Sequence, residues 1–60
     1  MNKFVIQSRE DLLVMSEIFR KNDIPAQLSH LFDENGEEVG ISLKLSDKIY
    51  FWSVGDEENV

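Results

Sequence analysis

The spacing of apolar residues changes along this chain, and each change predicts a different secondary structure. Residues 3–7 combine aromatic and β-branched side chains, which is typical of a short strand. From Arg9 to about Lys21 the apolar period becomes that of a helix. One arc of about 160° on this helix holds its apolar side chains, namely Leu12, Val14, Met15, Ile18 and Phe19. We expect an amphipathic helix that packs through this arc.

The residues around this segment indicate where the helix begins and ends. Ser8 can cap the first turn with its hydroxyl, and the acidic residues 10 and 11 suit the positive end of the helix dipole. Asn22 is a candidate for a left-handed cap, and Pro25 prevents the helix from continuing. Leu13 falls among the polar residues of the helix, so it is either a tolerated surface leucine or a contact for a partner.

Asn35 and Gly36 separate two apolar runs and predict a tight hairpin turn of two residues, both with positive φ. The flanking strands are expected at 26–32 and 39–45. Counting back from the turn pairs Phe32 with Val39, His30 with Ile41, Leu28 with Leu43 and Ala26 with Leu45. These residues then share one face, which the helix must cover, while more polar pairs occupy the other face.

A second turn near 46–48 leads into a last strand, Ile49–Val54, which does not alternate. A loop of even length places Tyr50, Trp52 and Val54 on the helix side, whereas a three-residue loop places Ile49 and Phe51 there. Either way, large apolar side chains remain on the open sheet face. The candidate partner-binding residues of this face are Leu31, Gly40, Ile49 and Phe51.

The expected fold is α+β, in the order β-α-β-β-β, with one amphipathic helix on one face of a mainly antiparallel sheet. The first strand runs parallel to its neighbour, beside either the second or the fourth strand. Residues 1–55 form one small domain, and residues 56–60 form an acidic, flexible tail.

The composition of the chain excludes more classes of function than any motif does. The net charge of −6, from 12 acidic and 6 basic residues, argues against direct binding to nucleic acid or to an anionic membrane. The chain has no Cys, which excludes thiol chemistry and thiolate metal sites. Its longest apolar run is residues 49–52, so we expect neither a membrane span nor a signal peptide. We expect a cytoplasmic location.

The expected topology brings most acidic residues to one end of the molecule. This acidic end holds the tip of the first hairpin, the start of the helix and the tail. Its candidate partner-binding residues are Asp33, Glu34, Glu37, Glu38, Asp56, Glu57 and Glu58. They are either solvated turn and tail residues or a docking site for a basic protein, such as a nucleic-acid-binding protein. A calcium site at residues 33–37 is less well supported, because the segment is too short for a calcium loop.

No residue pattern points to catalysis. His30 is the single histidine and is expected at the core or its edge with one hydrogen-bond partner, and no nucleophile or metal-ligand spacing accompanies it. We therefore expect no enzyme activity, cofactor or metal. The leading hypothesis is a small acidic interaction protein that modulates or inhibits a larger, basic partner. The small size also fits a protein of a phage or mobile element. The alternative is a homo-oligomeric module, such as a dimer, that associates through its open sheet face.

Overall fold

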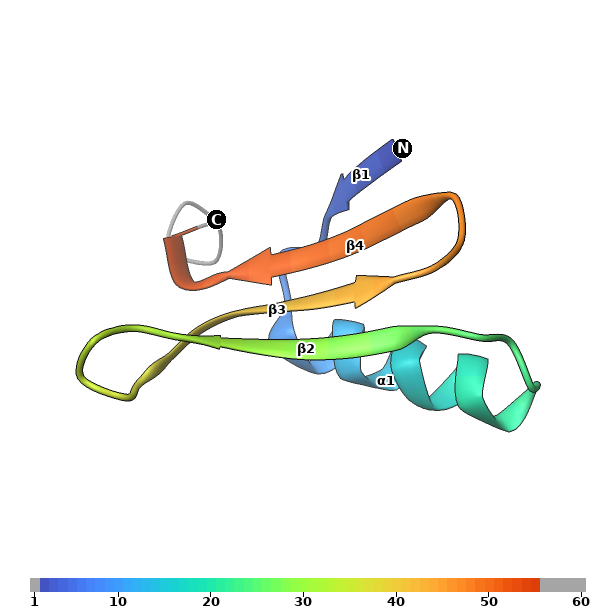
Figure 1. The fold of residues 1–60 in the computed structure, drawn as a ribbon, viewed down its shortest axis with the longest axis horizontal. Coiled ribbons are helices and arrows are strands. Elements are labelled where there is room, and N and C mark those ends of the chain that lie inside the picture. The colour runs from blue at the N-terminus through green and yellow to red at the C-terminus, as the bar shows by residue number, and fades with distance from the viewer. Residues whose placement is uncertain (1, 56–60) are drawn as a thin grey trace.

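The computed structural model describes residues 2–55, and its elements follow the expected order. They are β1 (Asn2–Val5), α1 (Arg9–Lys21), β2 (Gln27–Phe32), β3 (Glu38–Lys44) and β4 (Lys48–Ser53). One helix packs against one side of a four-stranded mixed sheet, so the α+β prediction is confirmed (Figure 1). The predicted tail, 56–60, lies outside the described residues.

The sheet order is β1-β4-β3-β2, which places the first strand beside the fourth. β1 pairs with β4 in parallel, while the two other pairings are antiparallel. The helix lies over β3 and β4, and only residues 6–8 connect β1 to it. This short connection leaves β1 next to β4, and the two edge strands are β1 and β2.

The core is small and centres on Leu12 of the helix. Leu12, Ile41, Leu43 and Trp52 are buried, and Leu13 is half-buried against them. Leu13 is therefore more buried than a tolerated surface leucine would be. It contributes to the core of the domain.

The predicted helix arc is only partly correct, because Val14 and Ile18 remain 50% and 51% exposed. Met15 and Phe19, from the same arc, pack against the core. A single sheet covers only part of the circumference of a helix, and α1 presents the side centred on Leu12 to β3 and β4. Val14 and Ile18 lie beyond that side. At the helix end, Asp23 has the left-handed conformation (φ 58°) that Asn22 was expected to adopt.

The β2–β3 turn differs from the expected one. Gly36 has the expected positive φ (81°), but Asn35 does not. Among the described residues other than glycine, Asp23 alone has a positive φ. The Gly36 amide donates to the Asp33 carbonyl (3.0 Å), and the Asp33 amide donates to the Glu37 carbonyl (2.9 Å). Residues 34 and 35 are thus the centre of the turn, and Gly36 follows in the left-handed position.

A β-bulge compensates for the longer loop. The predicted pairs His30–Ile41 and Leu28–Leu43 are correct, but Phe32 pairs with Glu38 instead of Val39. The register shifts between Leu31 and Phe32, so Val39 is the extra residue of the bulge. This shift turns Glu38 toward the helix side of the sheet, where a regular hairpin would have turned it away.

The β3–β4 loop has an even length. The Leu45 amide donates to the Lys48 carbonyl (2.8 Å), which leaves residues 46 and 47 as the turn. Tyr50 pairs with Leu43 and therefore faces the helix, and Trp52 pairs with Ile41 and is buried. Ile49 and Phe51 consequently lie on the open face.

Candidate protein-binding surfaces

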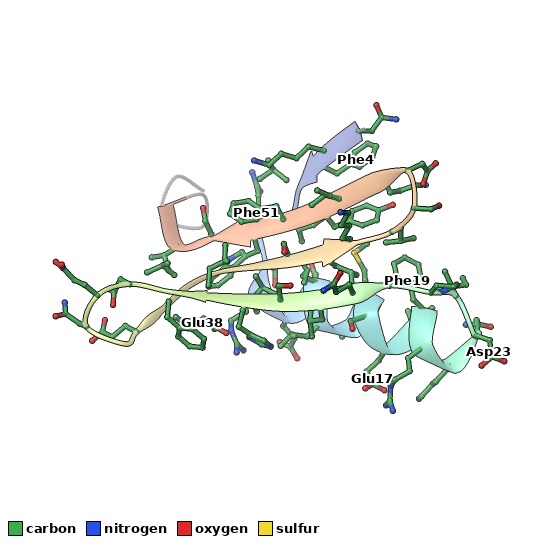
Figure 2. The ribbon with its side chains drawn as sticks, in the orientation of Figure 1. Phe4, Glu17, Phe19, Asp23, Glu38 and Phe51 are labelled. Atoms are coloured by element: carbon green, nitrogen blue, oxygen red, sulfur yellow. The ribbon has the colours of Figure 1, made fainter. Side chains whose placement is uncertain are left out.

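The hairpin tip and the start of the helix lie at the same end of the molecule, as the topology predicted. Arg9, the first helical residue, contacts Glu38, the first residue of β3. Figure 2 shows Glu38 near this end and Asp23 at the opposite end. Among residues 2–55, six carboxylates (Glu10, Asp11, Asp33, Glu34, Glu37 and Glu38) and one guanidinium, that of Arg9, lie around the hairpin tip and the first helical turn.

Glu38 is occupied by contacts within the chain. Its Oε2 accepts a hydrogen bond from Arg9 Nε (2.5 Å), and its Oε1 lies 2.6 Å from His30 Nδ1. A carboxylate only accepts, so Nδ1 carries the hydrogen. The bond from Arg9, followed by the one from His30, lowers the pKa of Glu38. His30 itself is exposed at the margin of the helix-facing side of the sheet, with Glu38 as its partner.

Asp33 also serves the fold. Its Oδ1 accepts hydrogen bonds from the Asn35 amide (2.9 Å) and the Glu37 amide (3.0 Å), which hold the turn in shape. Glu34 and Glu37 are exposed at the tip. Among the described acidic candidates, Glu34 and Glu37 are therefore the two whose carboxylates are exposed and do not stabilise the turn. The other three candidates, residues 56–58, lie outside the described residues.

No three His, Cys, Asp or Glu side chains form a metal-binding group in the described part of the chain. Within residues 2–55, no helix is long and apolar enough to cross a membrane.

Three of the four candidates for the open sheet face, Leu31, Gly40 and Phe51, lie together, and Ile49 lies on the same face farther along β4. A Cβ added at Gly40 would lie 3.4 Å from Leu31 Cδ1, 3.4 Å from Phe51 Cζ and 3.1 Å from the Trp52 carbonyl oxygen. The ring of Phe51 and the side chain of Leu31 thus occupy the space that the glycine leaves. Lys3 Nζ lies 4.7 Å from the centre of the Phe51 ring. Leu31 is 42% exposed, whereas Ile49 and Phe51 are half-buried.

Two further apolar surfaces were not predicted from the sequence. Phe32 is 61% exposed and Leu28 36% exposed, on the helix-facing side of β2 beyond the reach of the helix. Phe32 also stacks on the His30 ring at 6.5 Å. The second surface, a cavity of about 280 Å³ on the outer side of α1, is lined by Glu10, Leu13, Val14, Glu17, Ile18 and Lys21. Apolar periodicity predicts that a side chain prefers burial, but it does not say how far a helix covers a sheet.

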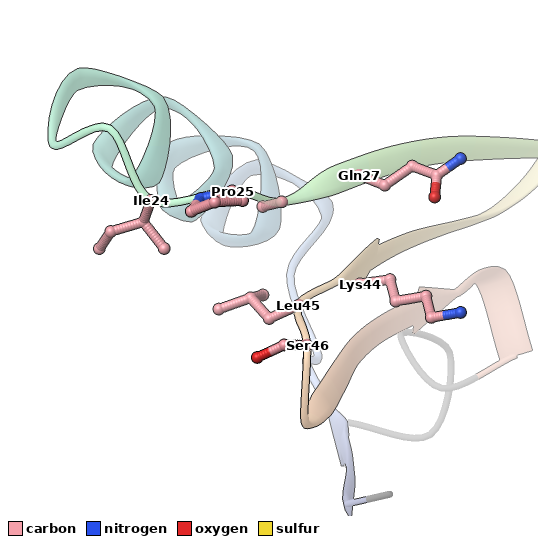
Figure 3. Close-up of a pocket in the computed structure, with 7 residues that line it drawn as sticks. Ile24, Pro25, Gln27, Lys44, Leu45 and Ser46 are labelled. Atoms are coloured by element: carbon pink, nitrogen blue, oxygen red, sulfur yellow. The ribbon is translucent and has the colours of Figure 1, made fainter.

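A shallow cavity lies at the opposite end, between the α1–β2 connection and the end of β3 (Figure 3). Its volume is about 490 Å³, and its lining residues include Ile24, Pro25, Lys44 and Leu45. The basic residues of this end, Arg20, Lys21, Lys44 and Lys48, come from the ends of α1 and β3 and the start of β4. Arg20 is paired with Glu17 at 2.6 Å.

Comparison with known proteins identifies no relative: no family model, curated protein or solved structure matches this chain.

Proposed function

We propose that this chain is a non-enzymatic interaction protein that binds a basic surface of a larger protein through its acidic hairpin end. The observation that carries this proposal is the largely exposed Phe32 side chain at the end of β2, directly before the turn that holds the exposed Glu34 and Glu37. An apolar anchor with a charged rim is a common arrangement at protein interfaces.

The carboxylates of this end supply attraction and orientation. Figure 1 shows the β2–β3 hairpin extending past the start of the helix, so its tip can reach a partner before the rest of the domain does. Charges placed in this way speed association with a surface of opposite sign, and their effect weakens as salt is added. The bonds that Asp33 accepts hold the tip in one conformation, which reduces the entropy lost on binding.

The apolar anchor supplies the part of the affinity that salt does not screen. Phe32 is the last residue of β2, and its ring is stacked on His30, which is in turn bonded to Glu38. The ring is therefore already oriented before a partner arrives. A basic protein with an apolar pocket would cover it, and occupation of that pocket would modulate or inhibit the partner. A cytoplasmic setting fits such a role.

Self-association through the open sheet face has less support. Phe51 and Leu31 fill the space over Gly40, and the ammonium group of Lys3 lies over the Phe51 ring. This face is thus partly closed by its own side chains, and burial against a second copy would have to desolvate Lys3.

Binding can be tested with two doubly substituted chains that have the same net charge. Immobilised wild-type chain, Glu34→Gln/Glu37→Gln and Asp23→Asn/Asp47→Asn are exposed to a cell lysate, and retained proteins are quantified by mass spectrometry at low and high salt. We expect a basic protein that wild type and the Asp23/Asp47 variant retain at low salt and the Glu34/Glu37 variant loses. Equal retention by the two variants would refute the assignment of the acidic end.

The anchor has its own test with the partner found in this way. Phe32→Ser should reduce affinity about tenfold or more, the range of an interface hot spot. Its effect on the thermal midpoint should be small because the ring is mostly exposed. Unchanged affinity would mean that the partner binds the charges alone.

A further inference from the structure

The outer edge of β2 is the least protected part of the sheet. β2 has one neighbouring strand among the described residues, β3, so its other side presents unpaired backbone N–H and C=O groups. The strand is six residues long, its sequence is Gln-Leu-Ser-His-Leu-Phe, and every residue is exposed or half-buried. It contains no acidic residue, lysine, arginine or proline.

The other edge of the sheet differs in the ways that usually prevent pairing with another chain. β1 has four residues, and one of them is Lys3. Short strands and edge lysines are common protections against intermolecular pairing. β2 has neither protection, which leaves its outer edge open to pairing with another chain.

We propose that a second copy of this chain binds along β2, so that the two β2 strands pair antiparallel in one continuous sheet. A two-fold axis perpendicular to the sheet relates the copies and leaves each helix over its own β3 and β4. The two acidic hairpins then point in opposite directions. The occupant is a copy of the same chain, and its strand supplies the hydrogen-bonding groups that β2 lacks on its outer side.

Charge placement favours this partner over an unrelated strand. In an antiparallel pair, the acidic end of each copy lies beside the basic end of the other. The hairpin with Glu34 and Glu37 then approaches an end where the three lysines 21, 44 and 48 outnumber the two carboxylates of Asp23 and Asp47. Opposite charges then attract each other at both ends of the dimer. A parallel pair would instead place like charges side by side, and these would repel each other.

Side-chain matching selects the register. Directly opposed residues in an antiparallel pair point to the same face of the sheet. The two-fold axis must therefore pass between one β2 residue and the same residue of the second copy. Centring the pair on His30 places Leu28 opposite Phe32 of the second copy, twice by symmetry. Centring it on Ser29 would instead place Leu28 opposite His30. The His30 register therefore covers the two exposed apolar residues that the helix leaves open.

The dimer goes beyond the function proposed above and does not depend on it. Both use the carboxylates of the hairpin tip and the Phe32 side chain, so binding of a basic partner and dimerisation should compete. Glu34→Gln/Glu37→Gln should weaken both. Leu28→Lys should weaken the dimer, because it places a charge in the middle of the paired edge.

Sedimentation equilibrium of the purified chain tests the dimer directly. We expect a concentration-dependent dimer whose dissociation constant rises about tenfold or more in Leu28→Lys, since a cross-strand apolar pair is lost at two symmetric places. Val14→Lys, on the outer side of the helix, is the matched control and should leave the dimer unchanged. A wild-type monomer at every soluble concentration would refute the proposal, as would equal weakening by both substitutions.

Single cysteines then test the register, because the natural chain has none. His30→Cys should form a disulfide-linked dimer under mild oxidation, since directly opposed Cα atoms in an antiparallel pair lie about 4.5–5.5 Å apart. Ser29→Cys should cross-link far more slowly, because its own copy is not opposite. Ser42→Cys reports on the open sheet face. Rapid cross-linking at Ser42 with none at His30 would place the interface on that face and overturn the β2 model.

Discussion

The carboxylate of Glu38 joins the first turn of α1 to both strands of the β2–β3 hairpin. It accepts from Arg9 of the helix and bonds to His30 of β2, while its own backbone begins β3. The β-bulge that involves Val39 is what turns Glu38 to the helix side. One local irregularity therefore creates an electrostatic link between the helix and the hairpin.

This link predicts a pH dependence of stability. The folded-state pKa of Glu38 lies below the ordinary value of 4.5, so its contribution is fully present above that value. It is lost as the pH falls through the lowered pKa. Compared with Glu38→Gln, wild type should be more stable to urea at neutral pH, and the difference should disappear in acid. Glu34→Gln, at the exposed tip, serves as the control. A constant difference between wild type and Glu38→Gln across this range would argue against the link.

At the scale of elements, the orientation of α1 decides which of its apolar residues stabilise the fold. Leu12 is fully buried against β3 and β4, and Leu13 packs beside it. Val14 and Ile18 lie at the margin of a shallow cavity that is open to solvent. The same helix thus contributes a core on one side and an apolar surface on another.

A pair of substitutions measures this orientation. Leu12→Ala should reduce the free energy of unfolding by about 3 kcal/mol, because it leaves a cavity in the core. Val14→Ala should change it by less than about 0.5 kcal/mol, since half of the side chain is already exposed. Urea denaturation followed by circular dichroism gives both values. Similar losses for the two variants would mean that the helix is rotated toward the arc predicted from periodicity.

At the scale of the whole molecule, one small core connects the helix to the central strands of the sheet. The core residues come from α1, β3 and β4, and Phe4 of β1 stacks on Tyr50 at 5.4 Å. β2 is attached mainly through β3 and stays largely exposed. The exposure of Leu28 and Phe32 is thus a consequence of a sheet that is wider than its single covering helix.

Because the core is shared, the domain should unfold in one step. Trp52, buried between helix and sheet, reports on tertiary structure through its fluorescence, while far-ultraviolet circular dichroism reports on secondary structure. We expect coincident urea transitions by the two probes, measured at one protein concentration. Loss of the fluorescence signal before the circular dichroism signal would show that the helix separates from a surviving sheet.

The sequence by itself determined the local features of this protein. Ser8 begins the helix by accepting from the Asp11 amide, Gly36 takes the left-handed position of the turn, and Leu28 to Leu31 keep the predicted register. These features depend on interactions between residues close in the chain or on simple alternation across one hairpin. The charge separation also followed from element order alone.

Only the tertiary structure decided the features that arise where elements meet. The position of β1 beside β4, the side of α1 that is buried and the exposure of Phe32 all depend on where the helix lies over the sheet. The contacts of Glu38 depend on a bulge that local preferences did not reveal, because an Asn-Gly pair suits both a two-residue turn and the longer one that Asp33 stabilises. Packing between distant segments, rather than the pattern within any one of them, produced the surfaces proposed for binding.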